Sequence, residues 1–176
     1  MRKPRKEKEG LVCWTDGARK DDESVGCVAV WNEVKWNKRR VHLGRQKKAF
    51  DAEMYAMSEA VKIADEICRE NEVRRVMVFT DSKATLRSIK YDMPGPGQAL
   101  ALRMMNWESE LLEKNIQVEY QWVPVYKGVE GNEKADQQVT IAAYKCMGKN
   151  TEIQNPLKHF DYITFFHPSR KLTELK

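Results

Sequence analysis

The chain has 176 residues, of which 41% are hydrophobic and 32% are charged, and its formal net charge at pH 7 is +5. This composition excludes a disordered protein, and the absence of any run of about 18 apolar residues predicts that there is no membrane span. The length fits one domain that buries about two-thirds of the surface of its unfolded chain. The positive charge points to a polyanionic partner, although many basic proteins bind no nucleic acid.

The N-terminal residues and the cysteines indicate the cellular compartment in which we expect the protein. Residues 1–9 are strongly basic, but no apolar stretch follows them, so we expect them not to act as a secretory signal. We interpret them as a disordered, solvated tail, with a nuclear address as the alternative. The four cysteines lie far apart without a Cys-x-x-Cys pair, which predicts neither a zinc knuckle nor a disulfide framework. We expect a reduced, intracellular protein, nuclear or cytoplasmic and not secreted.

Two short runs rich in Val, Trp and Cys, Leu11–Thr15 and Val25–Trp31, predict the first two strands. A third strand within Lys35–Leu43 completes an antiparallel meander. Asp16 follows the first run directly and precedes Gly17. An Asp before Gly most often forms a turn, so a role for Asp16 in cation binding requires further oxygen ligands from other elements.

The segment from residue 35 to residue 48 carries seven Lys and Arg residues and no acid, interleaved with Trp36 and His42. It has two interpretations of equal weight. One is the solvated face of an edge strand, where Lys commonly blocks aggregation. The other is contact with phosphates along a nucleic-acid backbone, for which we select Arg39, Arg40, Arg45, Lys47 and Lys48.

Apolar residues from Phe50 to Cys68 recur at steps of four and three, which predicts a helix with one apolar stripe. At about 100° per residue, Glu53 lies on the edge of that stripe, where the helix meets the sheet, whereas Glu59 points directly away from it. The alternative role for Glu53 is a favourable first-turn charge at the helix N-terminus.

The run Val73–Thr80 predicts a strand parallel to one neighbour, and it ends in Asp81. Asp81 is either the N-cap of the next helix or a ligand at the carboxyl end of a strand, where open α/β sheets bind ligands. A short helix to about Lys90 follows. After a break at Tyr91–Gly97, a longer helix runs from about Gln98 to Lys114.

Residues 116 to 122 alternate as a half-buried last strand, and a Gly-containing loop, Val125–Asn132, precedes the last helix. Asn132 is the predicted cap of that helix, and Asp136 falls in its first turn. Beyond Gly148 the pattern is unclear, with one strand-like run at Tyr162–Phe166.

Four acids therefore occupy two strand ends and two helix first turns, which can meet at one edge of a single sheet: Asp16, Glu53, Asp81 and Asp136. The surrounding motifs resemble the ribonuclease H domain. They are Trp14-Thr15-Asp16-Gly17-Ala18, Ala52-Glu53-Met54-Tyr55-Ala56, Phe79-Thr80-Asp81-Ser82, and Trp122-Val123-Pro124 followed by Gly128-Val129-Glu130-Gly131-Asn132-Glu133-Lys134-Ala135-Asp136.

The resemblance covers about Leu11 to Met147 and implies an α/β, three-layer fold with a five-stranded mixed sheet flanked by helices. We accordingly divide the chain into the tail 1–9, a ribonuclease H-like catalytic domain 10–148 and a C-terminal extension 149–176. The connection Pro94-Gly95-Pro96-Gly97-Gln98 looks most like ribonuclease H modules of non-LTR retrotransposon polyproteins. That likeness implies a possible reverse transcriptase domain in the same polyprotein, and we expect the isolated domain to be a monomer.

By the same resemblance, Asp16, Glu53, Asp81 and Asp136 correspond to the four metal-binding carboxylates of the family. They imply two Mg²⁺ ions, which Mn²⁺ can replace, and hydrolysis of the RNA strand of RNA/DNA hybrids. The regions that match substrate contacts in the minor groove lie near Gly17, Ala18 and the start of the Glu53 helix. We also assign Asn132 to nucleic-acid binding.

Two positions depart from the family pattern. Tyr126 stands where a loop His is usual, and a neutral phenol cannot take up a proton near pH 7 as imidazole does. Ala18 stands where relatives often carry a polar residue. We expect an active enzyme with slowed turnover. One alternative is a non-catalytic module that binds RNA/DNA hybrids. A second is a strand-transfer or DNA-nicking enzyme, which the Gly-Asn-x-x-Ala-Asp run disfavours.

Overall fold

The computed structural model describes residues 10–20, 22–31, 36–45, 47–70, 73–91, 94–124, 128–146 and 171–174. Its elements in chain order are β1 (Leu11–Lys20), β2 (Glu23–Trp31), β3 (Trp36–Gly44), α1 (Ala49–Cys68), β4 (Arg75–Thr80), α2 (Lys83–Lys90), α3 (Gln98–Glu113), β5 (Gln117–Trp122), α4 (Glu130–Cys146) and β6 (Lys171–Glu174). The predicted run Tyr162–Phe166 lies outside the described residues, as does the tail 1–9.

One mixed sheet has the strand order β3-β2-β1-β4-β5-β6. The first three strands pair antiparallel, and β4 pairs parallel with both β1 and β5. The predicted five-stranded mixed sheet flanked by helices is therefore confirmed. One further strand extends it, because β6 pairs parallel with β5 at the sheet edge, with Lys171 opposite Glu119.

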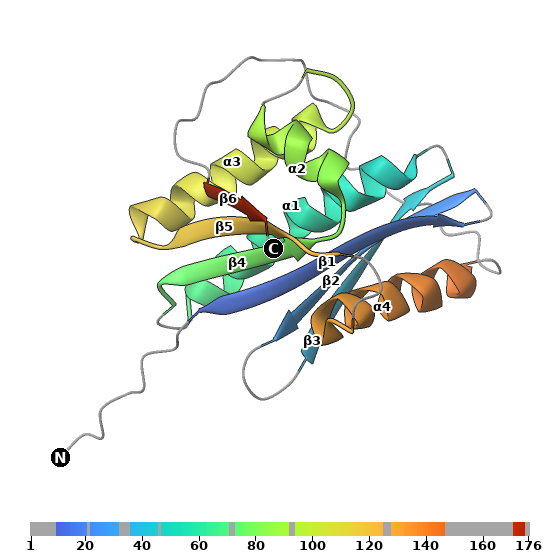
Figure 1. Cartoon of the computed structure of the whole chain (residues 1–176), viewed down its shortest axis with the longest axis horizontal. Coiled ribbons are helices and arrows are strands. Elements are labelled where there is room, and N and C mark those ends of the chain that lie inside the picture. The colour runs from blue at the N-terminus through green and yellow to red at the C-terminus, as the bar shows by residue number, and fades with distance from the viewer. Residues whose placement is uncertain are drawn as a thin grey trace.

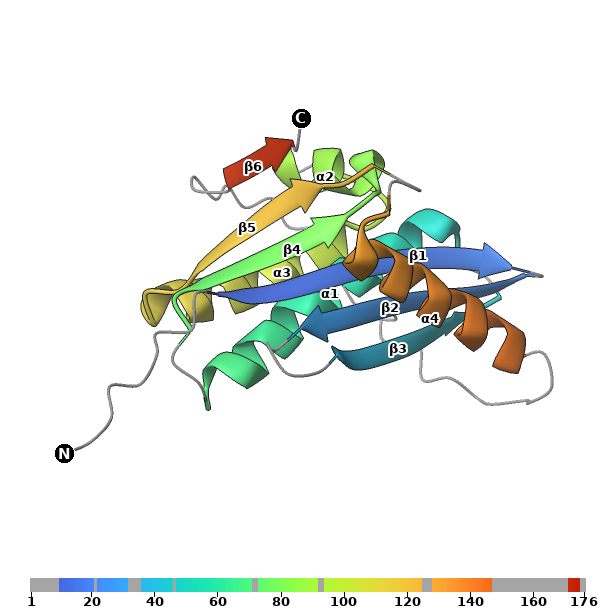
Figure 2. The same ribbon diagram turned by 60° about the horizontal axis from the view of Figure 1, so that its bottom comes forward.

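Helices cover both faces of the sheet (Figure 1). Side chains alternate along β4, and Val76 and Val78 join the main core with residues of α1 and α3. Figure 2 shows α4 crossing β1, β2 and β3 on the opposite face, where Ala142 and Ala143 pack against Val25 of β2. Within the described residues, no helix is both long and apolar enough to cross a membrane.

Glu59 corrects one prediction from helix periodicity. Glu59 was expected to point away from the apolar stripe and therefore toward solvent, yet it is only 5% exposed. The reason is that α1 packs against α3 as well as against the sheet, so its second side is also covered. The buried carboxylate lies 3.6 Å from Arg39 of β3 and 3.7 Å from Arg103 of α3, which supply the opposite charge that a buried acid requires.

Two glycines let α1 lie unusually close to the sheet. Gly17 and Gly26 are direct cross-strand partners on β1 and β2. A Cβ atom on Gly17 would lie 2.3 Å from the backbone nitrogen of Glu53, and one on Gly26 would lie 2.9 Å from the carbonyl oxygen of Ala52. The absence of both side chains therefore brings the backbone at Glu53 against β1.

Gly17→Ala should lower the free energy of unfolding by about 1–3 kcal/mol, because the added methyl group meets rigid backbone atoms and forces α1 away from β1. Urea denaturation measures this change. Because Glu53 would move with the helix, divalent-cation affinity should fall as well, which calorimetric titration measures. A variant with the stability and cation affinity of the parent chain would show that the close approach is not needed.

Candidate active site

Asp16 lies inside β1 and not at its end, because β1 continues to Lys20. The parallel pairing with β4 does stop at Thr15 and Thr80, so Asp16 is the first residue beyond the end of β4 while it still pairs with Cys27 of β2. Its residue is 8% exposed, and the Gly17 N–H donates a 2.7 Å hydrogen bond to its Oδ1. The predicted strand end was wrong, since a two-stranded ribbon extends past the sheet.

Asp81 directly follows β4, as predicted, but it does not cap α2. The N-cap is Ser82, whose Oγ accepts a hydrogen bond from the Thr85 N–H at 3.4 Å. The indole Nε1–H of Trp122 donates to the Asp81 carbonyl oxygen at 3.0 Å and so holds this backbone. Because Ser82 satisfies the helix N-terminus, the carboxylate of Asp81 is available to the pocket described below.

Glu53 is the fifth residue of α1 and belongs to its second turn. The acid of the first turn is Asp51, whose Oδ2 accepts a 2.8 Å hydrogen bond from the Lys48 N–H. The helix-dipole explanation therefore applies to Asp51 instead of Glu53. One carboxylate oxygen of Glu53, Oε2, is buried and has no hydrogen-bond partner in the described part of the chain.

The first turn of α4 lies against Trp14. A Cβ atom on Gly131 would be 2.1 Å from the Trp14 ring, and that ring stacks on Phe79 with 4.2 Å between centroids. Asn132 is the third residue of α4 and not its cap, because the helix begins at Glu130. It is 6% exposed, and its Nδ2 donates to Asp81 Oδ2 at 3.4 Å.

These elements bring the acids together. Asp16, Glu53 and Asp81 each offer a carboxylate oxygen, and the three oxygens lie within 4.8 Å of one another. They open into a pocket of about 350 Å³. Asp136 lines the same pocket, but its predicted place in the first turn was wrong, because α4 begins at Glu130 and Asp136 is an exposed residue of the second turn. The full lining is Asp16, Gly17, Ala18, Glu53, Asp81, Ser82, Asn132, Glu133 and Asp136.

The pocket is strongly electronegative, since none of its lining residues is basic. Burial raises the pKa of Asp16, and the charges of Asp81 and Asp136 raise it further. Burial also raises the pKa of Glu53, followed by the charges of Asp16 and Asp81. Burial raises the pKa of Asp81, against a lowering by the Asn132 hydrogen bond. A divalent cation would relieve this repulsion and give Glu53 Oε2 a partner.

Glu133 lines the pocket but was not among the predicted site residues. The sequence spacing would have indicated it. Glu133 precedes Asp136 by three residues, and residues three apart on a helix are neighbours.

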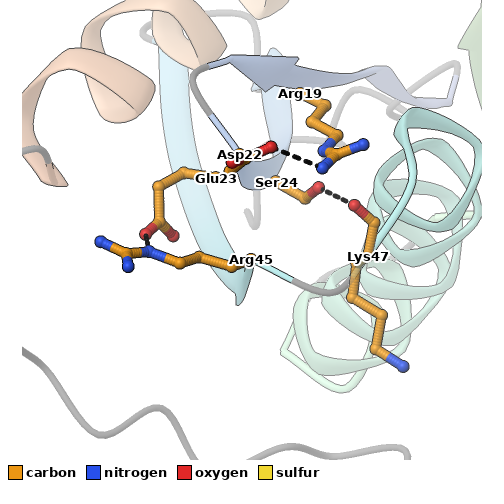
Figure 3. A network of polar contacts seen from close by, with 6 residues as sticks. All are labelled: Arg19, Asp22, Glu23, Ser24, Arg45 and Lys47. Atoms are coloured by element: carbon orange, nitrogen blue, oxygen red, sulfur yellow. Dashed lines mark hydrogen bonds and ion pairs between the residues drawn. The ribbon is translucent and has the colours of Figure 1, made fainter.

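The basic residues selected from the sequence do not form one surface. Alternation along β3 sends Arg39 toward α1, where it pairs with Glu66 at 3.0 Å, and Arg40 toward α4, where it bonds Gln138. Arg45 pairs with Glu23 at 3.1 Å (Figure 3).

The other two selected residues lie at the start of α1. The carbonyl of Lys47 accepts a hydrogen bond from Ser24 Oγ, while the Lys47 side chain extends away from this network in Figure 3. Lys48 is exposed at the N-cap of α1. Tyr126 lies outside the described residues.

The fold and pocket define an α/β domain with a cluster of acidic residues at the carboxyl end of its central parallel strands. The model of the RNase H family matches residues 8–144, and the chain belongs to that family. Members of this family act on RNA/DNA hybrids and generally use divalent metals.

The fold likeness extends to solved structures. One is the N-terminal RNase H domain of Rv2228c from Mycobacterium tuberculosis, solved as a fusion with maltose-binding protein. It matches with a TM-score of 0.54 and 15% identity, over 78% of this chain and 99% of that one. No relative is found among curated proteins by sequence comparison.

Proposed function

We propose that this chain is a metal-dependent endonuclease that hydrolyses the RNA strand of RNA/DNA hybrids. The observation that carries the proposal is the approach of the Asp16, Glu53 and Asp81 carboxylates to within 4.8 Å in a pocket that Asp136 also lines. Such a cluster is unfavourable without cations, because burial, followed by the charges of neighbouring acids, raises the pKa of Asp16, Glu53 and Asp81. Family membership supports the substrate class.

The donor set fits Mg²⁺ or Mn²⁺, which prefer carboxylate and amide oxygens. Two such ions, when bound by Asp16, Glu53, Asp81 and Asp136, would supply an activated water and stabilise the leaving oxygen. Neighbouring groups of the protein hold these carboxylates in position. The Gly17 N–H fixes one oxygen of Asp16, and Asn132 Nδ2 fixes one oxygen of Asp81.

Three residues of the pocket are suited to recognise the RNA strand. Gly17 and Ala18 line it beside Asp16, and because Ala18 has no polar side chain, hydrogen bonding there falls to backbone groups. Asn132 Oδ1 is buried without a hydrogen-bond partner within the described residues. An amide oxygen can accept from a 2′-hydroxyl, the group that distinguishes RNA from DNA.

A cleavage assay tests the proposal. The purified chain is incubated with a labelled RNA/DNA hybrid and Mg²⁺ or Mn²⁺, beside the variant Asp81→Asn. Cleavage of the RNA strand by the parent chain and its loss in the variant are expected. Equal cleavage by both would show that the activity does not come from this pocket.

Tyr126 favours slowed turnover. Tyr126→His should raise the rate of hybrid cleavage by about tenfold or more at pH 7, because imidazole can exchange a proton there and a neutral phenol cannot. Steady-state rates in Mg²⁺ measure the gain, with Tyr126→Phe as the matched aromatic control. If neither the parent chain nor Tyr126→His cleaves, even in Mn²⁺, while both still bind hybrid, the chain is a non-catalytic binding module instead.

The connection from Pro94 to Gln98 supports a further proposal on context. We propose that the domain acts inside the cell as a module of a retroelement polyprotein, beside a reverse transcriptase domain. The coding sequence tests this directly. A reading frame that does not continue into a reverse transcriptase would contradict it.

A further inference from the structure

The exposed face of α2 is basic along its length. Lys83, Arg87 and Lys90 are four and three residues apart, so they lie on one side of the helix, and all three are exposed. The opposite side is buried in the core through Leu86 and Ile89. We call Lys83, Arg87 and Lys90 the α2 basic surface.

The charges of the α2 basic surface are not neutralised within the described part of the chain. The Lys83 ammonium lies 4.0 Å from the Trp122 ring centroid, and that of Lys90 lies 5.3 Å from the Tyr91 ring. Aromatic rings attract a cation but carry no net charge. By contrast, Arg39 and Arg45 are each paired with a glutamate. Unlike Arg39 and Arg45, the α2 basic surface therefore keeps its positive charge available for an external anion.

The α2 basic surface begins at the acidic pocket. Ser82 lines that pocket, and Lys83 is the next residue. Lys83 and Lys90 are seven residues apart, so the surface extends about 10 Å along the helix axis. Successive phosphates of one duplex strand are about 3.4 Å apart along its axis. The α2 basic surface is thus long enough to contact more than one phosphate of a strand that continues from the pocket.

We propose that the α2 basic surface binds the phosphodiester backbone of the nucleic-acid duplex that the pocket cleaves. The inference rests on the proposed function, because it requires a nucleic-acid substrate. It replaces β3 with α2 as the main phosphate-binding element. Tyr91, 65% exposed at the end of α2, extends the same surface with an aromatic ring.

Binding of a labelled RNA/DNA hybrid tests the inference. All proteins carry Asp81→Asn to prevent cleavage, and binding is measured in Mg²⁺ over a range of salt concentrations. Arg87→Ala/Lys90→Ala should weaken binding by roughly tenfold at low salt and reduce the slope of log K against log salt by about 1.8. Ala preserves the helix, which circular dichroism checks.

Two variants with the same change in net charge serve as controls. Lys62→Glu places the change on α1, and Lys47→Ala/Lys48→Ala places it on the segment selected from the sequence. Lys62→Glu should bind within about twofold of the Asp81→Asn parent, and Lys47→Ala/Lys48→Ala should weaken binding less than Arg87→Ala/Lys90→Ala does. A normal salt slope for Arg87→Ala/Lys90→Ala would overturn the inference, and a reduced slope for Lys47→Ala/Lys48→Ala alone would return the role to that segment.

The failure of the inference is distinguishable from failure of the proposed function. If the chain without substitutions cleaves the hybrid but Arg87→Ala/Lys90→Ala binds normally, only the role of α2 is wrong. If the chain neither cleaves nor binds the hybrid, the proposed function itself is wrong. Duplex DNA and duplex RNA, run beside the hybrid, should show the same dependence on α2, because backbone contacts carry no base information.

Discussion

Asp81→Asn should reduce the rate of hybrid cleavage by more than about a hundredfold. Loss of an outer partner of a metal ligand commonly costs 10–100-fold in activity or metal affinity, and a ligand itself should cost more. The substitution keeps the volume of the side chain and leaves the Ser82 cap of α2 in place. It removes the negative charge and replaces one of the two carboxylate oxygens of Asp81, a member of the acidic cluster, with an amide group.

Cleavage rates at saturating Mg²⁺, together with calorimetric Mg²⁺ titration, measure this effect. Glu113→Gln is the matched control, because it removes one carboxylate from the exposed end of α3. Its rate should stay within about twofold of the parent rate. Near-parental cleavage by Asp81→Asn, with unchanged Mg²⁺ affinity, would remove Asp81 from the metal-binding set.

Hydrophobic periodicity predicted the elements well, because α1 and the central strands have repeating apolar positions that packing must satisfy. The end of β1 was misplaced for a physical reason. The Asp16-Gly17 pair resembles a turn, but Gly17 is needed for the close approach of α1, where a Cβ would meet Glu53 nitrogen at 2.3 Å. Local sequence does not distinguish these two uses of glycine.

The acidic pocket was accessible from sequence because each acid lies beside a motif with fixed positions. The phosphate-binding residues could not be predicted in the same way, since the number of basic residues in a segment does not show which of them form ion pairs or hydrogen bonds in the fold. Arg39 and Arg40 are adjacent in sequence but point to opposite faces of the sheet, one toward Glu66 and the other toward Gln138. The α2 basic surface became evident only once exposure and pairing were known.

Glu53→Gln should stabilise the metal-free protein while it impairs the proposed activity. Burial, followed by the neighbouring acids, raises the pKa of Asp16 to about 7 and that of Glu53 to about 9. The folded state thus binds more protons than the unfolded state between about pH 4, where free carboxyl groups titrate, and these raised values. By linkage, the free energy of unfolding falls as pH rises across this window.

Glu53→Gln removes the acid with the larger rise in pKa, which must take up a proton on folding at pH 8. At pH 8 without metal, Glu53→Gln should raise the free energy of unfolding by about 1 kcal/mol or more, or about 2–4 °C in Tm. At pH 4 the gain should disappear, because the carboxyl groups of the folded parent are already protonated there. Thermal denaturation in EDTA at both pH values measures the difference, with Glu113→Gln as the control that should change neither.

Mg²⁺ should reverse the order of stability. A cation that binds only the folded state stabilises it by about 2.7 kcal/mol at a concentration of 100 times Kd. The parent chain, with its full set of carboxylates, should gain more than Glu53→Gln, whose affinity is reduced. If Mg²⁺ raises the Tm of both proteins equally, or of neither, Glu53 does not take part in cation binding, and its burial beside Asp16 would need another explanation.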